Sequence, residues 1–456
     1  MRIPSLGRVA GREGNAASVH KAGTPQTARR RLAIDSAARP AVLQPWVLPG
    51  SRSTLTPATQ ALRQSCGVPV PCAIVPPVPV PYREPLFARL AQRGRISPHV
   101  IYLAPAQPGW DQRADWFTAR GGYPVETLRS WQRTRPGRSP LMVARGLGRA
   151  LRRAQPACVV SWEYGPATWR ALAWCRRRRR PLVVFSELTP WSDSELSDTQ
   201  LRVHRALTPR VDRFVVTSSQ GRERLVRMGV DPARVEVALQ SADLGPYEAL
   251  PDRAGAPVRV LCVGRLVPDK NLDTLIEAFA ATGLGADQAE LVLAGAGPLE
   301  QDLRAAAART GAAVGFTGFV APDDLPGLYA EADVLALVST YEPFGVTMRE
   351  GAAAGLPLLC TRRAGAAGDV AVEGENALLV DPSDRDAIAS ALRRLVLEAD
   401  LRRRLAAGSR AVTERHPLEA DAEAWERAVL GAVAAPSARR TQTSRSSRRT
   451  PPASTD

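Results

Sequence analysis

Hydrophobic residues recur with two different periods in the second half of the chain, and the order of those periods predicts an α/β fold. Residues 258–263 (VRVLCV) form an apolar run interrupted only by Arg259, which is typical of a parallel strand buried on both faces. A helical stripe follows, with apolar residues at i, i+3, i+4 and i+7: Leu272, Leu275, Ile276 and Phe279. Further strands are expected at 290–295, 332–339 and 356–360, and further helices at 299–309, after Phe344 and at 384–397. Such alternation predicts βαβ units with helices on both faces of a parallel sheet.

The same alternation runs, less regularly, through residues 71–240. The apolar runs predict five strands, at 72–76, 99–104, 157–162, 181–186 and 212–218. Helices are expected near 84–93, 140–153, 166–178 and 219–228. We therefore expect a second doubly wound sheet in the first half of the chain.

The stretch 244–257 separates the two halves. It has Pro or Gly near both ends and no apolar period, so we interpret it as a linker between domains. The predicted fold is α/β, with two Rossmann-like, doubly wound parallel-sheet domains that face each other across a cleft at the carboxyl ends of their strands. The expected boundaries are a disordered basic tail at 1–70, an N-terminal domain at 71–245, a C-terminal domain at 246–416, a helix at 417–435 that crosses back to the first domain, and a disordered basic tail at 436–456.

The formal net charge of +16 lies mainly in the two tails. The first 70 residues hold ten Lys or Arg and two acidic residues, and residues 436–456 hold five Arg and one Asp. Both tails are rich in Pro, Ser, Thr, Ala and Arg without hydrophobic periodicity, which predicts disorder. Because the remaining surface carries an ordinary charge, we expect no nucleic-acid partner. No apolar run approaches the roughly 20 residues that a membrane-spanning helix needs.

Cysteine and histidine usage gives no sign of a metal site. The six cysteines are widely scattered and include no C-x-x-C pair, so we expect buried, reduced thiols in a cytosolic protein. The four histidines are too far apart in sequence to suggest a metal cluster. Residues 1–23 lack the apolar stretch of a secretory signal.

Two cations follow the first strand of the second half, in the segment GRLVPDKN. Arg265 and Lys270 stand just ahead of a predicted helix N-terminus. A guanidinium and an ammonium beside the unbonded N–H groups of a helix start favour binding of a diphosphate. In the next loop, GAGP, Gly295 and Gly297 would allow close approach of a ligand to the backbone, but taken alone they favour a tight turn.

Two carboxylates flank a glycine turn in YEPFGVTMREG, residues 341–351. Glu342 precedes the turn and Glu350 lies one turn into the following helix, so we expect both to face the same space. The amides of Val346 and Thr347 at the helix start favour an anion. Carboxylates bind paired hydroxyl groups well, through charge-assisted hydrogen bonds. A diphosphate with hydroxylated rings on either side, a nucleotide sugar, is the ligand that this pattern predicts.

These segments resemble the large family of retaining glycosyltransferases with the GT-B fold, often called group 1 or family 4. The resemblance covers roughly residues 72–433. It is strongest over 258–397, in the segments GRLVPDKNLDTLIEAF, LVLAGAGPLEQDL, VGFTGFV and STYEPFGVTMREGAAAGLPLLC. It implies that the C-terminal domain binds the nucleotide-sugar donor, that the N-terminal domain binds the acceptor, and that transfer retains the anomeric configuration, by front-face displacement or through a covalent intermediate. No cofactor and no metal are expected.

The resemblance also implies a role for each matching residue. Glu342, Arg265 and Lys270 would be catalytic, the first beside the transferred sugar and the two cations at the leaving diphosphate. Further donor contacts are implied for sugar and phosphate at Phe344, Gly345, Val346 and Thr347, for the ribose at Glu350, and for the base at Gly297, Phe319 and Val320. Either uridine or guanosine would fit.

The first domain departs from the family's commoner pattern, because IVPPVPVPYREPLF has no glycine-rich loop after its first strand. Tyr82 and Arg83 resemble a subgroup with PPYR at this place, and we expect them on the acceptor side. Glu187 stands near a position where relatives often carry histidine. It would orient the acceptor hydroxyl, or serve only as a structural carboxylate.

A membrane surface is a further expected partner. The run Arg176–Arg180, with Trp169 and Trp174 before it and the predicted basic helix 140–153, suits an anionic lipid surface. We therefore expect a cytoplasmic enzyme, attached peripherally to the inner face of the plasma membrane. Its acceptor would be a glycan, a lipid-linked sugar or a small molecule in cell-envelope polysaccharide or glycoconjugate synthesis.

Two other functions remain open from the sequence. A nucleotide-sugar epimerase on the same fold would need acid and base groups in the cleft, and the two-glutamate segment fits transfer better. An inactive nucleotide-sugar-binding scaffold would not need Glu342, Arg265 and Lys270 together.

Overall fold

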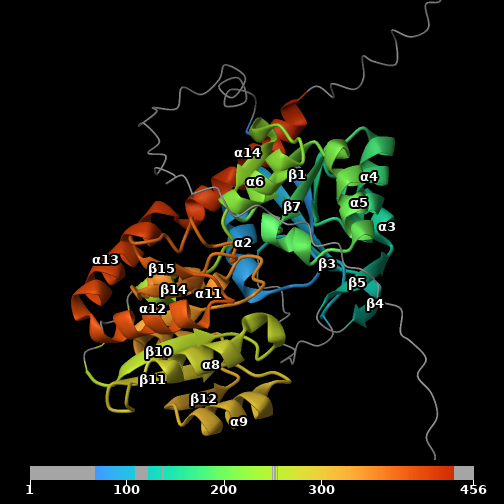
Figure 1. Ribbon diagram of the computed structural model, residues 1–456. Helices are drawn as coiled ribbons and strands as arrows, with labels where there is room; N and C mark the ends of the chain where they lie inside the picture. The colour runs from blue at the N-terminus through green and yellow to red at the C-terminus, as the bar shows by residue number, and fades with distance from the viewer. Residues whose placement is uncertain are drawn as a thin grey trace, which may run out of the picture. The chain divides into compact units, whose positions relative to one another are not determined.

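The computed structural model describes residues 67–107, 122–135, 138–248, 250, 253 and 255–435. The predictions of disorder for the two tails, at 1–70 and 436–456, concern residues that lie outside this part except for 67–70. The described part contains two parallel sheets, each with helices on its faces (Figure 1).

The first sheet has seven parallel strands in the order β3-β2-β1-β6-β7-β8-β9. The strands are β1 (Val70–Val75), β2 (Ile96–Tyr102), β3 (Val125–Thr127), β6 (Cys158–Trp162), β7 (Leu182–Ser186), β8 (Arg213–Val216) and β9 (Val235–Val237). Its central strands are buried throughout, which explains why they appear in the sequence as continuous apolar runs. The strand order reverses between β1 and β6, and ligands bind at such a reversal in doubly wound sheets.

Three helices of the first domain lie where the sequence predicts them, the one expected at 140–153 does not, and the helix at 198–207 was not predicted. They are α2 (Glu84–Arg93), α3 (Leu147–Ala154), α4 (Pro166–Arg178), α5 (Asp198–Leu207) and α6 (Ser219–Arg227), with short 3₁₀ turns η1 (Pro81–Arg83), η3 (Pro190–Ser194), η4 (Thr208–Arg210) and η5 (Pro232–Arg234). Helices α2 and α4 occupy the ranges expected from their apolar stripes, 84–93 and 166–178.

The helix predicted at 140–153 is wrong in its first half. Residues up to Arg145 belong to an antiparallel hairpin, β4 (Arg129–Arg135) and β5 (Arg138–Arg145), that forms a separate two-stranded sheet. Met142 and Ala144 are buried while Leu141 and Arg145 are exposed, which is the period of a strand. The helix starts only after Gly146, whose φ of 85° ends the strand.

The tryptophans and arginines of the predicted membrane patch on α4 do not lie on the same surface. Trp169 and Trp174 are partly buried and pack against the core of the first sheet, so they do not join Arg176–Arg180 on the exposed side. The five arginines are exposed at the end of α4 without these two aromatic partners.

The second sheet has six parallel strands in the order β12-β11-β10-β13-β14-β15. The strands are β10 (Val258–Val263), β11 (Ala289–Ala294), β12 (Val314–Gly318), β13 (Val334–Leu337), β14 (Leu358–Thr361) and β15 (Ala377–Val380). The helices are α7 (Gly245–Glu248), α8 (Leu272–Ala281), α9 (Glu300–Thr310), α10 (Leu325–Ala330), α11 (Val346–Ala353), α12 (Arg385–Leu397) and α13 (Ala399–Arg415). The order reverses between β10 and β13, which is the arrangement of a Rossmann sheet.

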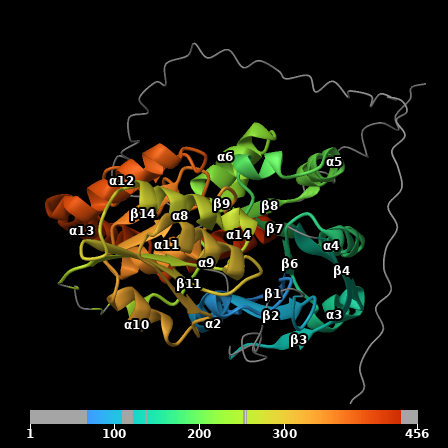
Figure 2. The same cartoon turned by 60° about the horizontal axis from the view of Figure 1, so that its bottom comes forward.

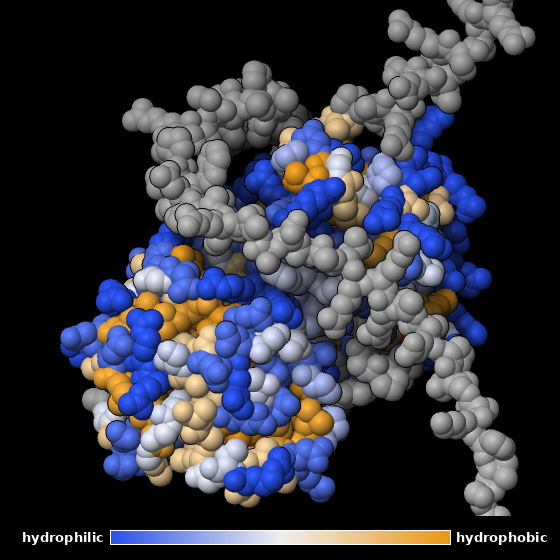
Figure 3. Space-filling model, viewed as in Figure 1, coloured by the Kyte–Doolittle hydropathy of each residue, from blue (hydrophilic) through white to orange (hydrophobic). Residues whose placement is uncertain are grey.

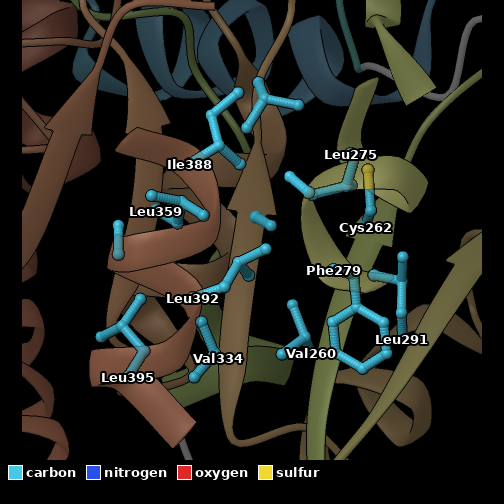
Figure 4. Close-up of a cluster of buried hydrophobic side chains, with 14 of the residues drawn as sticks. Val260, Cys262, Leu275, Phe279, Leu291, Val334, Leu359, Ile388, Leu392 and Leu395 are labelled. Carbon is cyan, nitrogen blue, oxygen red and sulfur yellow. The ribbon is translucent and has the colours of Figure 1, made fainter. Parts of the chain in front are cut away.

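Helices cover both faces of the second sheet. On one face, α8 and α12 pack over the central strands, and Figure 4 shows Phe279 and Leu392 among the side chains of Val260 and Val334. On the other face, α11 packs through Met348. A Cβ atom on Gly351 would lie 2.4 Å from Leu335, so α11 approaches the sheet more closely than a side chain at that position would allow.

The predicted linker at 244–257 begins with the short helix α7. Leu239 and Tyr247 already pack into the core of the second sheet, whereas Ala238 belongs to the core of the first. The change from one core to the next therefore comes a few residues before the predicted boundary at 245.

The last described helix, α14 (Leu418–Ala434), packs against strands of the first sheet and against α2 (Figure 2). Trp425 is fully buried in the first-sheet core, and the Glu426 carboxylate accepts hydrogen bonds from Arg93 (3.0 Å) and Arg95 (3.1 Å). At its start, Asp421 accepts a hydrogen bond of 2.7 Å from Arg349 of α11. Helix α14 thus joins the second domain to the first through a buried ion pair.

None of the described helices combines the length and apolar character needed to cross a bilayer. On the face seen in Figure 3, hydrophilic residues dominate and the apolar ones lie in separate patches. The five described cysteines are buried and unbridged, as the sequence predicts: Cys72, Cys158, Cys175, Cys262 and Cys360.

The Arg349–Asp421 pair generates a test of how the domains are joined. Both side chains are nearly inaccessible, and Arg349 also donates to the carbonyl oxygen of Gln240 (2.9 Å). Arg349→Met would leave the buried Asp421 carboxylate without its partner, so we expect the free energy of unfolding to fall by about 3–5 kcal/mol. The measurement is chemical or thermal denaturation of the full chain.

The matched control is Arg394→Met, which removes an exposed ion pair with Glu398 on α12. An exposed pair contributes only about 0–1 kcal/mol. Equal destabilisation by the two variants would show that the Arg349–Asp421 pair is not a structural anchor.

Candidate functional site

An ion pair joins the loops that leave the two central strands of the second sheet. Lys270 follows β10 and Glu342 follows β13, and the Lys270 ammonium contacts the Glu342 carboxylate. Both side chains are largely buried, with 19% and 11% of their surface exposed. Because β10 and β13 are neighbours at the strand-order reversal, residues 72 positions apart in the sequence meet there. Arg265, in the same loop as Lys270, is exposed.

Asn271 fixes the loop that carries Lys270. Its side-chain amide donates to the carbonyl oxygens of Val338 (3.1 Å) and Pro382 (2.8 Å), and its φ is 57°. The amide of Thr340 also bonds to the carbonyl oxygen of Asp269 (3.0 Å). Asn271 was not predicted from the sequence, although asparagine tolerates positive φ and is suited to such a turn.

Backbone contacts fix the segment that carries Glu342. The carbonyl oxygen of Glu342 accepts a hydrogen bond from the amide of Gly365 (3.0 Å), and the carbonyl oxygen of Phe344 accepts one from the amide of Ala366 (2.8 Å). A Cβ atom on Gly365 would lie 2.0 Å from the Pro343 carbonyl oxygen, so only glycine fits there. Gly365 could not be predicted from the sequence, because its partner segment around Pro343 is 22 positions away in the chain.

Gly345 turns the chain into α11. Its φ is 97°, and a Cβ atom would lie 2.9 Å from Leu337. No side chain caps the helix, so the amides at Val346 and Thr347 keep the hydrogen-bonding capacity and partial positive charge of a helix start. The Phe344 side chain is only 3% exposed and belongs to the core, so its predicted contact with a ligand could involve only its backbone.

Glu342 and Glu350 have different partners. The Glu350 carboxylate accepts a hydrogen bond of 2.7 Å from the hydroxyl of Tyr329, which is 1% exposed. Burial raises the pKa of Glu350, and the hydrogen bond from Tyr329 opposes that shift. Tyr329, which lies in α10 and would orient Glu350, was not predicted from the sequence.

The predicted base-binding residues lie on separate loops. Phe319 is 41% exposed, and Val320 packs partly against the second core. A Cβ atom on Gly297 would lie 2.3 Å from the carbonyl oxygen of Leu266. The close approach that the sequence suggests at Gly297 is therefore made by the protein's own loop after β10.

The predicted acceptor-side residues lie together on the first sheet. Arg83 donates to Glu187 over 2.9 Å, and its guanidinium lies over the rings of Trp162 (4.6 Å) and Tyr82 (5.2 Å). Tyr82 and Arg83 follow β1 and Glu187 follows β7, so the cluster spans the reversal of that sheet.

Glu163 is a carboxylate of this cluster that the sequence analysis missed. It directly follows β6 with φ of 50°, and it accepts hydrogen bonds from the Ser186 hydroxyl (2.8 Å) and the amide of Glu187 (2.6 Å). Burial raises its pKa to about 7. Positive φ at a residue other than glycine is uncommon and accumulates at functional sites.

Tyrosine side chains lie where the carboxylates of the two domains come close. Burial raises the pKa of Tyr341 to about 12, and the carboxylates of Glu163, Glu187 and Glu342 add to that shift. Burial likewise raises the pKa of Tyr82, with Glu187 and Glu342 again contributing. A hydrogen bond of 2.7 Å also joins the two domains, from the backbone amide of Ser219 to the carboxylate of Asp369. Carboxylates of both clusters thus lie close enough to act on the same two tyrosines.

Two family models match the chain, one on each domain. Glycosyl transferases group 1 matches residues 252–412, and Glycosyltransferase Family 4 matches residues 86–244. The chain belongs to the group 1 glycosyltransferases.

Curated relatives of this glycosyltransferase match over part of their length. The GDP-mannose-dependent alpha-(1-6)-phosphatidylinositol monomannoside mannosyltransferase of Mycobacterium tuberculosis is 36% identical over 32% of this chain and 40% of its own. The D-inositol 3-phosphate glycosyltransferase of Rhodococcus jostii is 32% identical over 48% of this chain and 51% of its own length. The chain thus spans about half or less of the length of these relatives.

Solved structures share the GT-B fold of this glycosyltransferase. Anabaena HepE in complex with UDP and glucose has a TM-score of 0.63 and 21% identity, and the match covers 79% of this chain and 99% of HepE. Sucrose-phosphate synthase from Thermosynechococcus elongatus has a TM-score of 0.60 and 19% identity, over 78% and 98%. These likenesses establish the fold of the glycosyltransferase.

Metal independence stays a prediction for this glycosyltransferase. Within the part of the chain that the structure describes, no group of three or more His, Cys, Asp or Glu side chains could hold a metal ion.

The raised pKa of Glu163 predicts a pH dependence of stability. A carboxyl whose pKa rises on folding, here from 4.5 to about 7, stabilises the fold below pH 4.5, and that contribution is lost as the pH rises towards 7. Glu163→Gln keeps an acceptor for Ser186 and does not titrate. We expect the thermal midpoint of the variant, relative to that of the wild type, to rise as the pH increases from 4.5 to 7.

The measurement is a series of melting curves for the two proteins in matched buffers. A constant difference between their midpoints across this window would contradict the assigned shift. Glu223→Gln, at an exposed position on α6, serves as the control and should track the wild type at each pH.

Proposed function

We propose that the protein is a retaining, metal-independent hexosyltransferase that moves a sugar from a nucleotide-diphosphate sugar to a hydroxyl group of an acceptor. The observation that carries this proposal is the Lys270–Glu342 ion pair, at the strand-order reversal of the second sheet and near the uncapped start of α11. It supplies a cation for phosphate and a carboxylate for sugar hydroxyls in one place.

The cations and helix amides would bind the diphosphate. A phosphate beside Lys270 competes with Glu342 for the ammonium group, and Arg265 lies in the same loop. The amides at Gly345 and Val346 and the Thr347 hydroxyl would complete the phosphate contacts. Positive charge at these positions stabilises the leaving nucleoside diphosphate, which develops negative charge as the sugar departs.

The two glutamates would hold the parts of the donor on either side of the diphosphate. Glu342, once Lys270 contacts phosphate, can accept from the sugar hydroxyls and stabilise positive character at the anomeric carbon. Glu350, oriented by Tyr329, would accept from the ribose hydroxyls. Phe319 and Val320 would lie near the base, with the loop around Gly297 behind them.

The acceptor would bind against the cluster on the first sheet. Tyr82 and Arg83 offer a phenol and a guanidinium, and Glu187 offers a carboxylate for the attacking hydroxyl. The expected acceptor is a glycan or a lipid-linked sugar in cell-envelope polysaccharide or glycoconjugate synthesis. A relative named for GDP-mannose and a fold neighbour solved with UDP support a nucleotide-sugar donor and leave guanosine and uridine as the candidate bases.

Glu342→Ala tests the proposed reaction. We expect turnover to fall at least about a hundredfold, because the interaction with the positive anomeric carbon exists mainly in the transition state. Binding of UDP or GDP should stay within a few-fold of the wild type, since that ligand lacks the sugar. The measurements are sugar transfer or donor hydrolysis with a panel of nucleotide sugars, and calorimetric titration with the nucleotide.

Glu277→Ala, at an exposed position on α8, is the control for loss of a carboxylate and should retain full turnover. Unchanged turnover in Glu342→Ala would refute the assignment. If the protein releases an epimerised nucleotide sugar and transfers no sugar, the function is that of an epimerase and not of a transferase.

Arg265→Ala and Lys270→Met test the diphosphate site. Each removes a charged hydrogen-bond donor, which contributes about 1.5–3 kcal/mol, so the Kd for UDP or GDP should rise roughly tenfold or more. The Kd for the corresponding nucleoside should stay the same, because it has no phosphate. Equal weakening of nucleotide and nucleoside would contradict a specific role at the phosphates.

A further inference from the structure

The outer face of the β4–β5 hairpin is both apolar and basic. Its strands pair so that six side chains lie on that face as three cross-strand pairs: Arg129 with Arg145, Trp131 with Val143, and Arg133 with Leu141. Trp131 is 53% exposed and Leu141 is 48% exposed. A tryptophan, a leucine and a valine thus lie among three arginines on one face of a two-stranded sheet.

No acidic residue offsets this charge along the hairpin. Residues 129–145 contain five arginines and no Asp or Glu, and the adjoining α3 adds three arginines, of which Arg153 pairs with Glu126. Both views place the hairpin beside α3 (Figures 1 and 2). The face therefore has the composition of an interfacial surface, with apolar side chains among cations.

The inner face of the hairpin packs against the acceptor loop, the segment 76–83 between β1 and α2. Met142 is buried in a cluster with Val78 and Val80, and Tyr82 packs against that cluster. Gln132 donates to the carbonyl oxygen of Ala106 (3.1 Å), and the Ser130 hydroxyl donates to that of Leu103. One face of the hairpin is thus bound to the segment that leads to Tyr82 and Arg83, and the other face is exposed.

We propose that the outer face of the β4–β5 hairpin docks on an anionic lipid bilayer, so that the acceptor loop lies at the membrane surface. This inference rests on the proposed function only for its purpose, which is the delivery of a lipid-linked acceptor. Trp131, Leu141 and Val143 enter the headgroup region, while Arg129, Arg133 and Arg145 pair with lipid phosphates.

The chemistry of the face favours lipid over nucleic acid. Arginines and an exposed tryptophan would suit either ligand, since bases stack on aromatic rings. Leu141 and Val143 distinguish the two ligands. Aliphatic side chains are stabilised when they move from water into the headgroup region of a bilayer, and they offer a nucleobase neither stacking nor a hydrogen bond.

The arginine run on α4 provides an internal comparison. Arg176–Arg180 are exposed and equally basic, but Trp169 and Trp174 pack towards the core. That surface offers charge without the apolar component. Docking by the hairpin and simple attraction of a basic protein to anionic lipid therefore predict different effects of substitutions at the two places.

Sedimentation of the full chain with vesicles distinguishes these two cases. The vesicles are an equal mixture of phosphatidylglycerol and phosphatidylcholine, with phosphatidylcholine alone for comparison, at physiological salt. The variants are the pairs Trp131→Ser with Leu141→Ser, and Arg129→Ser with Arg133→Ser. All four positions are exposed, so the fold should tolerate the changes, and unchanged circular dichroism and melting curves check this.

The wild type should sediment with the anionic vesicles. Loss of two arginines should weaken partitioning about thirtyfold, and loss of the two apolar side chains about tenfold or more. The control pair, Arg177→Ser with Arg178→Ser, removes the same charge from α4 and should change partitioning less than about threefold. The basic tails are present in all these proteins, so they do not affect the comparison.

Three outcomes would overturn the proposal: no binding of the wild type to anionic vesicles, equal losses in the hairpin and α4 variants, or hairpin variants that bind like the wild type. Retention on duplex DNA in place of vesicles would assign the face to nucleic acid and overturn it as well.

A second readout separates this proposal from the proposed function. The hairpin variants should retain the wild-type Kd for UDP or GDP and the wild-type rate of donor hydrolysis. If these activities are absent in all the proteins while vesicle binding behaves as expected, the proposed function fails and the docking surface stands. If they are present and the hairpin variants bind vesicles normally, only the docking surface fails.

Discussion

The contact between Lys270 and Glu342 is the interaction on which the candidate site depends. It brings together the loops after β10 and β13, which are neighbours only because the strand order of the second sheet reverses between them. Asn271 fixes the cation's loop, and backbone bonds to Gly365 and Ala366 fix the carboxylate's segment. The same contact holds a cation for the diphosphate of a nucleotide sugar and a carboxylate for its sugar hydroxyls. On donor binding, Lys270 would bind phosphate in place of Glu342, and Glu342 would bind the sugar hydroxyls in place of Lys270.

The second constraint is that the cluster around Arg83 on the first sheet must keep its position relative to this pair. Helix α14 is anchored in the first core by Trp425 and joined to α11 through Asp421 and Arg349. Residue 349 is adjacent to Glu350, so the helix that carries a predicted ribose contact is also the helix that holds the domains together. A buried charge pair suits this role because its geometry is specific and a lone buried charge is costly.

Much of the fold was predictable because buried parallel strands and amphipathic helices leave strong patterns. The run VRVLCV and the stripe on α8 are examples, and both match the structure. The β4–β5 hairpin was missed because its short, arginine-rich strands resemble the start of a basic helix until Met142 and Ala144 are seen to be buried together. Charge and loop position singled out Arg265, Lys270, Glu342 and Glu350, and the resemblance to a family assigned a role to each. Asn271, Gly365, Tyr329 and Glu163 act through partners that are distant in sequence or through unusual backbone angles, which hydrophobic periodicity does not encode.

The central claim is that a nucleoside diphosphate binds where Lys270 meets Glu342. The most direct measurement is a crystal structure of the full chain with UDP or GDP. The account predicts phosphates in contact with Lys270 and the first amides of α11, the ribose hydroxyls beside Glu350, and the Lys270 ammonium withdrawn from Glu342. A nucleotide bound elsewhere, with the ion pair intact, would contradict it.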